Sequence, residues 1–182
     1  MIPFQVWLEA ALQSFQHVAA VMQLHWSWPA AESAHFIGLT LLLGSIGAWD
    51  LRLIGLLEDV PISAFHRLVP FAVLGFAINA ASGTLFLMTS PDQYVYNPAF
   101  HLKMLCLLLA GLNVAFFYVA IFRRVSTLGP GAPPPPFARL SGALSLVLWI
   151  TVIVCGRMIT FLRPAVCNPG EAIGFLAECI VR

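Results

Sequence analysis

The chain has 182 residues, of which 60% are hydrophobic and only 9% are charged, whereas a soluble domain carries about 25% charged residues. Such a composition cannot cover a folded chain with polar surface, which excludes an ordinary water-soluble domain. The formal net charge of +1, without a dense basic run, excludes nucleic acid as a partner.

The first element that we expect is an amphipathic helix over residues 1–28. Glutamine and glutamate recur near helical spacing on one side, and aromatic and aliphatic residues occupy the other. This pattern favours the membrane surface, although a fifth span is an alternative. Because the first 50 residues contain no Lys or Arg, we expect no cleaved signal peptide. The polar side consists of Gln5, Glu9, Gln13, Gln16 and Gln23.

Four later stretches are long enough to cross a bilayer, which requires about 20 apolar residues of helix. Pro61, Pro91, Pro98 and the GPGAPPPP segment at 129–136 mark helix boundaries. Short connections make successive spans antiparallel neighbours. We therefore expect an all-α membrane protein, with a four-helix up-and-down transmembrane bundle over residues 29–162. The predicted spans are approximately 31–57, 62–89, 98–122 and 137–162.

Loop charges predict the orientation of this bundle. Arginines flank the first and third connections, whereas the second has only Asp92 between its helices. By the positive-inside rule, the first and third connections are cytoplasmic. Both termini, including a tail over residues 163–182, are then periplasmic in a bacterial inner membrane. The arginines are Arg52, Arg67, Arg123, Arg124 and Arg139.

The four cysteines fall into two kinds. Cys106 and Cys155 lie inside apolar runs, where cysteine fills core space. Cys167 and Cys179 lie in the polar tail and would form a disulfide if the tail faces an oxidising compartment. The two-cysteine pattern leaves both the bridge and free thiols open.

Polar side chains inside the spans each require a partner or a function. At the cytoplasmic ends of the first two spans, we expect Asp50 to pair with Arg52 or Arg67; a proton relay that includes His66 is the alternative. Near mid-membrane, asparagines favour interhelical hydrogen bonds worth about 1 kcal/mol, or they line a ligand pocket. The predicted structural polar network consists of Glu32, Asp50, Arg52, Arg67, Asn79 and Asn113.

A periplasmic layer of polar residues is the candidate cofactor site. A b-type haem with two histidine ligands uses facing imidazoles, while Lys or Arg neutralises the propionates. His35 and His101 are the candidate iron ligands, and Arg157 and Lys103 would face anionic groups of the haem or of a quinone. Helix phase argues against His35 and His101 as a pair of ligands. The side chains of His101 and Lys103 point about 200° apart around the third span, so both cannot face the bundle interior. Without a cofactor, His35 would hydrogen-bond with Glu32 or with a neighbouring span.

A family resemblance covers about residues 31–162. The run ESAHFIGLTLLLGSIGAWDLRLIG, followed by HRLVPFAVLGFAINAASGTLF, NPAFHLKM and SLVLWITVIVCGRMITF, resembles a family of uncharacterised bacterial four-helix membrane proteins. That family is distantly similar to the copper-resistance D proteins and to membrane-embedded b-type cytochromes. The resemblance implies a bundle scaffold with a redox or metal role. Because the chain lacks four in-helix histidines, it implies one haem at most.

Together these features predict a membrane subunit that takes part in electron transfer and binds one haem b or a quinone near the periplasmic face. The alternatives are a non-catalytic anchor or assembly subunit of a larger membrane complex or homo-oligomer, and a copper or small-solute permease. Met104, Met158 and Cys106 suit soft Cu(I), but no Met-x-x-Met or Cys-x-x-Cys pair occurs. Since no nucleotide-binding or metalloprotease motif occurs, we do not expect an enzyme by itself.

Overall fold

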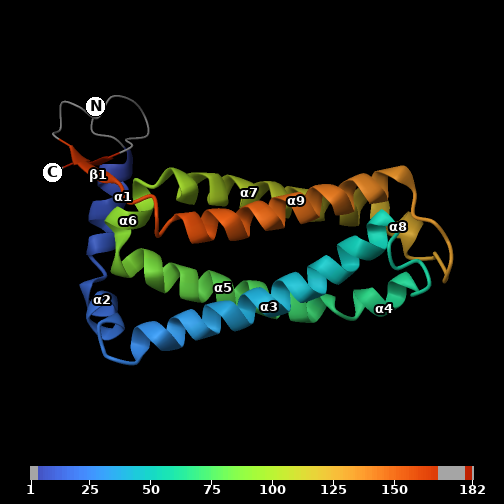
Figure 1. Ribbon diagram of the computed structural model, residues 1–182, viewed down its shortest axis with the longest axis horizontal. Helices are drawn as coiled ribbons and strands as arrows, with labels where there is room; N and C mark the ends of the chain where they lie inside the picture. Colours follow the sequence, from blue (N-terminus) through green and yellow to red (C-terminus); the bar gives the residue numbers. More distant parts are fainter. Residues whose placement is uncertain (1–3, 168–178, 182) are drawn as a thin grey trace.

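The computed structural model describes residues 4–167 and 179–181. It is mostly helical, at 78%. Among the described residues, four helical segments are long and apolar enough to cross a membrane, which confirms the predicted number of spans. These segments lie lengthwise along the molecule (Figure 1). They are Ser27–Ile54, Ile62–Thr89, Pro98–Val125 and Pro136–Met158.

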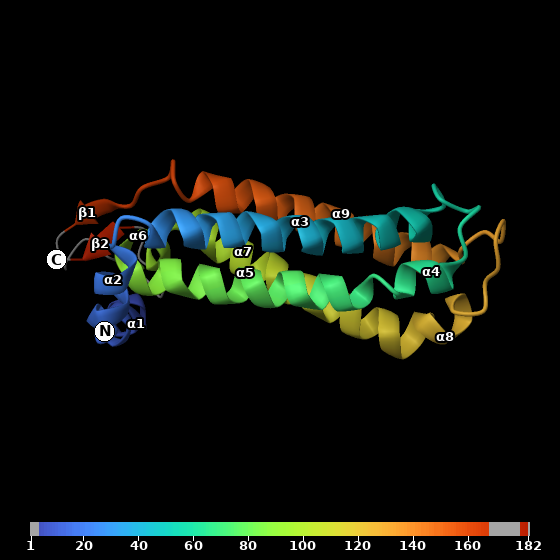
Figure 2. The ribbon, with the colours of Figure 1, turned by 90° about the horizontal axis from the view of Figure 1, so that it is seen from below.

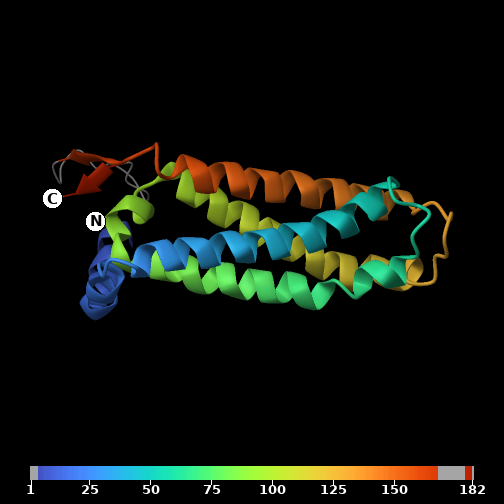
Figure 3. The same ribbon diagram turned by 60° about the horizontal axis from the view of Figure 1, so that its bottom comes forward.

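The spans are built from seven helical elements. The first is α3 (Ser27–Ile54), and the second combines α4 (Ile62–His66) with α5 (Val69–Thr89). The third combines α7 (Pro98–Phe116), the π-helical turn η1 (Phe117–Ile121) and α8 (Phe122–Val125), and the fourth is α9 (Pro136–Met158). Figure 2 and Figure 3 show the chain running from one end to the other along each span in turn.

Helix boundaries follow from local chemistry. Gly55 ends α3 with a φ of 98°, a left-handed conformation that glycine adopts without strain. Pro91, Pro98 and Pro136 each occupy a first helical turn, where the missing N–H removes no hydrogen bond. Asn97 caps α7, since its side-chain oxygen accepts from the backbone N–H of Ala99 at 2.9 Å.

The four spans do not pack equally. α3 lies against both α5 and α9, and α7 lies against α9, whereas α5 and α7 scarcely touch. The backbones of α3 and α5 approach each other closely, because a Cβ built on Gly75 would lie only 2.6 Å from the Gly38 carbonyl oxygen. Small residues permit such close approach between helices in a membrane. The bundle therefore runs in the order α5, α3, α9, α7, with its open side between α5 and α7.

The surface of the bundle is as apolar as its interior. Large side chains such as Phe36, Leu74, Leu108, Val119 and Ile150 are exposed on the four spans. Inside, Cys106 and Cys155 are buried free thiols that contribute to the packing. An exposed apolar surface of this extent requires a lipid environment.

The N-terminal region forms two helices rather than the single expected one. These helices, α1 (Phe4–Gln13) and α2 (Gln16–Met22), lie across one end of the bundle beside α6 (Pro91–Val95) (Figure 1). We call this end the α6 end and the opposite one the α4 end.

Part of the polar side of α1 faces the protein instead of water. Gln5 is 1% exposed and donates to the Val95 carbonyl oxygen at 3.1 Å, while Glu9 accepts from the Tyr96 hydroxyl at 2.8 Å. Trp7, by contrast, is 66% exposed. Burial, together with the bond to Glu9, raises the pKa of the Tyr96 phenol, so the phenol remains a donor at neutral pH. Specific partners on α6 thus override the simple amphipathic pattern.

The described part of the tail forms two short parallel strands, β1 (Ala165–Cys167) and β2 (Cys179–Val181). In their register, Cys167 lies opposite Val181 and Cys179 opposite Ala165. The side chains of both cysteines lie outside the described residues, and the disulfide stays a prediction.

Gly75→Ala tests the close α3–α5 packing. The added methyl group would meet the backbone of α3, so we expect the free energy of unfolding to fall by about 1–3 kcal/mol, measured by thermal unfolding in mild detergent. Gly47→Ala is the matched control, since nothing lies within 4 Å of its Cβ position. Equal stability of the two variants would contradict the packing described here.

Candidate functional site

A cavity of about 320 Å³ lies among α3, α5, α7 and α9, in the half of the bundle toward the α4 end. Its lining includes Val73 and Phe76 of α5 and Val114 of α7, all of which are also exposed on the surface. The cavity therefore opens laterally between α5 and α7, two helices that scarcely touch. Its volume falls in the range of small-molecule sites, about 300–1,000 Å³.

Aromatic rings form much of the cavity wall. Trp49 and Phe117 meet edge to face with centroids 5.8 Å apart, and the other aromatic lining residues are Phe65, Phe76, Tyr118 and Trp149. Phe117 and Tyr118 belong to η1, and such π-helical turns are frequent at functional sites. These walls suit a flat, apolar ring.

Two buried polar atoms, each from a residue that lines the cavity, have no hydrogen-bond partner among the described residues. Asp50 is 3% exposed; Ser145 of α9 is a hydrogen-bonding neighbour of its carboxyl group, but Oδ2 is unpartnered. Nε1 of the buried Trp149 is likewise unpartnered. One is an acceptor and the other a donor. Each unsatisfied buried group costs about 1–3 kcal/mol, which a suitable ligand could recover.

The ion pair that the sequence favours for Asp50 is not formed. Arg67 is exposed, and the guanidinium group of Arg52 turns away to the loops at the α4 end. Side chains two residues apart on a helix point about 200° apart, so Asp50 and Arg52 cannot both face the bundle interior. Asp50 is left as a buried carboxyl group without a cationic partner among the described residues.

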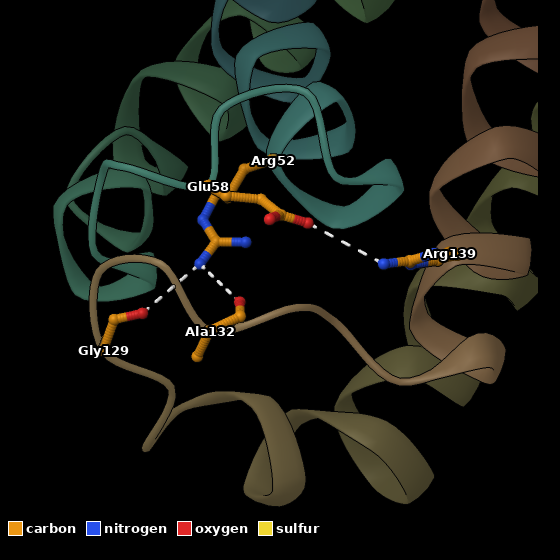
Figure 4. Close-up of polar contacts among 5 residues, drawn as sticks. All are labelled: Arg52, Glu58, Gly129, Ala132 and Arg139. Carbon is orange, nitrogen blue, oxygen red and sulfur yellow. Dashed lines mark hydrogen bonds and ion pairs between the residues drawn. The ribbon is translucent and has the colours of Figure 1, made fainter.

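Arg52 instead joins two loops. Its Nε donates to the Val60 carbonyl oxygen at 2.8 Å, and its Nη2 donates to Ala132 at 3.2 Å and to Gly129 at 3.5 Å (Figure 4). The first carbonyl belongs to the loop after α3 and the other two belong to the connector before α9. Arg52 therefore fixes the α4 end, two residues from Asp50 along α3. Nearby, Glu58 and Arg139 form a longer and more exposed pair at 3.7 Å (Figure 4).

The two mid-membrane asparagines differ in their partners. Asn113 of α7 donates to the Ser141 carbonyl oxygen of α9 and accepts from the Ser141 hydroxyl, both at 3.0 Å, and both residues line the cavity. Asn79 donates within its own helix to the Gly75 carbonyl oxygen at 2.9 Å, beside the close contact with Gly38. Asn113 thus links two helices, and Asn79 does not.

The hydrogen bonds around Ser82 favour one tautomer of His35. The Ser82 hydroxyl oxygen of α5 lies 2.7 Å from the Ile78 carbonyl oxygen and 2.8 Å from His35 Nδ1. With the hydroxyl hydrogen donated to Ile78, the Ser82 oxygen accepts from His35 Nδ1–H. The Nε2 of His35 then carries a lone pair, the form that ligates metals or accepts protons.

The other members of the predicted periplasmic site have their own neighbours, although the Lys103 ammonium group interacts electrostatically with His35. His101 Nε2 donates to the Val95 carbonyl oxygen at 2.8 Å, at the α6–α7 junction. Lys103 reaches toward α9, where its Nζ lies 3.5 Å from the Cβ position of Gly156. Arg157 is exposed and its guanidinium carbon lies 5.1 Å from the centroid of the Phe161 ring. The two imidazoles are thus engaged with different partners, and these four residues do not line the cavity.

Glu32 is exposed at the start of α3, and His66 is exposed at the end of α4, where its ring packs beside Trp49 and Phe122. Among the described residues, no group of three or more His, Cys, Asp or Glu side chains could hold a metal ion.

The α9 side of the cavity was not predicted from the sequence. Ser141, Ser145 and Trp149 recur every four residues on one face of this helix and are all buried. A stripe of two hydroxyls and an indole in an apolar span is a signal that could have identified a polar cavity lining.

Neither protein-family models, nor curated proteins, nor solved structures gave a match to this chain.

Arg52→Met tests the loop connection at the α4 end. The change removes the charged donor from three backbone carbonyls, so we expect a loss of at least about 2 kcal/mol in unfolding free energy. The control is Arg139→Gln, which removes a partly exposed ion pair worth about 0–1 kcal/mol. Thermal unfolding in detergent measures both; an Arg52→Met midpoint as high as that of Arg139→Gln would contradict this role.

Proposed function

We propose that this protein is a membrane subunit that binds a quinone in the cavity between α5 and α7 and serves electron transfer in the bilayer. The observation that supports the proposal is the pair of unpartnered polar atoms, Asp50 Oδ2 and Trp149 Nε1, which belong to two residues of a mostly apolar and aromatic lining. A quinone carbonyl accepts from the indole N–H, and a quinol hydroxyl donates to the carboxyl group.

The route of entry also favours a ligand that is dissolved in lipid. The cavity opens between two lipid-facing helices, and exposed side chains such as Val73 and Val114 form its rim. A head group of one ring fits about 320 Å³, while a prenyl tail extends between α5 and α7 into the bilayer. This cavity lies nearer the α4 end of the bundle than the periplasmic cofactor site that the sequence predicts.

We further propose an up-and-down bundle with both termini periplasmic in a bacterial inner membrane. The support is the positive-inside rule, because Arg67, Arg123, Arg124 and Arg139 all lie at the α4 end. Helices α1 and α2 then lie on the periplasmic surface, with the exposed Trp7 at the level of the headgroups. The quinone site is in the cytoplasmic half of the membrane.

Binding of a short-chain ubiquinone to the purified protein tests the proposal. Trp149→Phe keeps the ring but removes the N–H donor, and Asp50→Asn removes the carboxylate. We expect each to weaken binding about tenfold, or roughly 1.4 kcal/mol, in isothermal titration calorimetry. Trp28→Phe is the control, because Trp28 packs on Phe86 and does not line the cavity. Unchanged affinity in both cavity variants would refute the proposal.

A haem is the second candidate, because Ser82 orients His35 with a free lone pair on Nε2. The quinone proposal predicts purified protein without a Soret band and with extractable quinone. A Soret band that disappears in His35→Ala would replace the quinone proposal by the haem one. Protein that holds neither group would favour the anchor or permease alternatives.

A further inference from the structure

A second hollow, of about 210 Å³, lies on the outside of the bundle near the α4 end. We call it the connector groove, because it lies between the third span and the proline-rich connector that leads into α9. It shares no lining residue with the cavity between α5 and α7. The groove is lined by Phe116, Ala120, Ile121, Arg124, Pro135 and Phe137.

The groove has an apolar body and a single cationic end. Phe116 and Phe137 are both large, apolar and exposed, so their rings meet whatever surrounds the protein. Arg124 lies in the last turn of α8, is exposed, and its side chain has no hydrogen bond or ion pair among the described residues. A long hydrocarbon chain that carries one anionic group matches this polarity.

The dimensions fit one leaflet of a bilayer. Phe116, Ala120 and Arg124 follow one another at four-residue spacing, so they form a stripe along the helix. Eight residues of α-helix span roughly 12 Å, and the π-helical turn η1 within the stripe shortens this length. One leaflet contains about 15 Å of hydrocarbon. The stripe therefore extends from the interior of the leaflet to the level of the headgroups, where Arg124 lies.

The connector explains how irregular backbone can border lipid here. Unpaired N–H groups are unfavourable in hydrocarbon, but the four residues at 133–136 are all proline and have no N–H. A polyproline segment is also stiff, so this wall of the groove keeps its shape without backbone N–H donors.

We propose that the connector groove binds an anionic phospholipid, with its acyl chain over Phe116 and Phe137 and its phosphate on Arg124. Arginine suits a phosphodiester because its planar guanidinium group can donate two parallel hydrogen bonds. The net charge at this end supports the choice of an anionic lipid. Four exposed arginines lie there with only two acidic residues, Glu58 and Asp59, and one of these arginines already pairs with Glu58. The lipid would hold the connector against the third span.

Native mass spectrometry of the full chain, after delipidation and incubation with phosphatidylglycerol or phosphatidylcholine, tests this site. We expect phosphatidylglycerol to be retained in preference to phosphatidylcholine and to raise the thermal unfolding midpoint. Arg124→Gln should lower the retention of phosphatidylglycerol about fivefold, which matches the roughly 1 kcal/mol of one basic residue at an anionic surface.

Arg123→Gln is the matched control, since it changes the net charge equally but removes a residue that does not line the groove. The thermal unfolding midpoint of each variant is first measured without lipid, to show that the variant folds. If Arg124→Gln does not fold, Arg124→Lys replaces it, and we expect an intermediate loss of phosphatidylglycerol retention. Equal losses in the position-123 and position-124 variants, or equal retention of phosphatidylcholine, would overturn the proposal. Protection by inorganic phosphate alone, equal to that by phosphatidylglycerol, would identify a free-phosphate site and would also overturn it.

Discussion

The contact between the backbones of α3 and α5 is the interaction on which the rest of the structure depends. At Gly38 and Gly75 neither helix has a side chain, so the two backbones meet directly. α5 is thereby held on α3 and kept away from α7. In a bilayer no hydrophobic effect drives helices together, and packing of this kind decides which spans are neighbours. The lateral opening of the cavity follows from that choice of neighbours.

Much of the fold could be predicted from local features of the chain. Apolar length identified the four spans, because a peptide backbone in lipid must satisfy its hydrogen bonds within a helix. Prolines such as Pro98 marked helix starts. The orientation of α1 could not be predicted, since Gln5 and Glu9 hydrogen-bond to partners about ninety residues away. A helical pattern shows that two faces differ, but it does not show which face has a protein partner.

The candidate site was less predictable than the fold. Sequence depth grouped His35 with His101, but hydrogen bonds to Ser82 and to Val95 engage them separately. Helix phase is the more informative guide, because it assigns His101 and Lys103 to different faces of the third span. For Asp50, the nearest arginine in sequence faces the loops. The cavity itself depends on the order of the helices around the bundle, which no local pattern encodes.

Photoaffinity labelling with an azidoquinone, followed by mapping of the labelled peptides, tests the quinone site most directly. The account predicts labels on the two helices that border the opening, over residues 69–76 and 107–118, and competition by unlabelled quinone. Labels confined to the α6 end around His35 and His101, or labels that unlabelled quinone does not reduce, would contradict it.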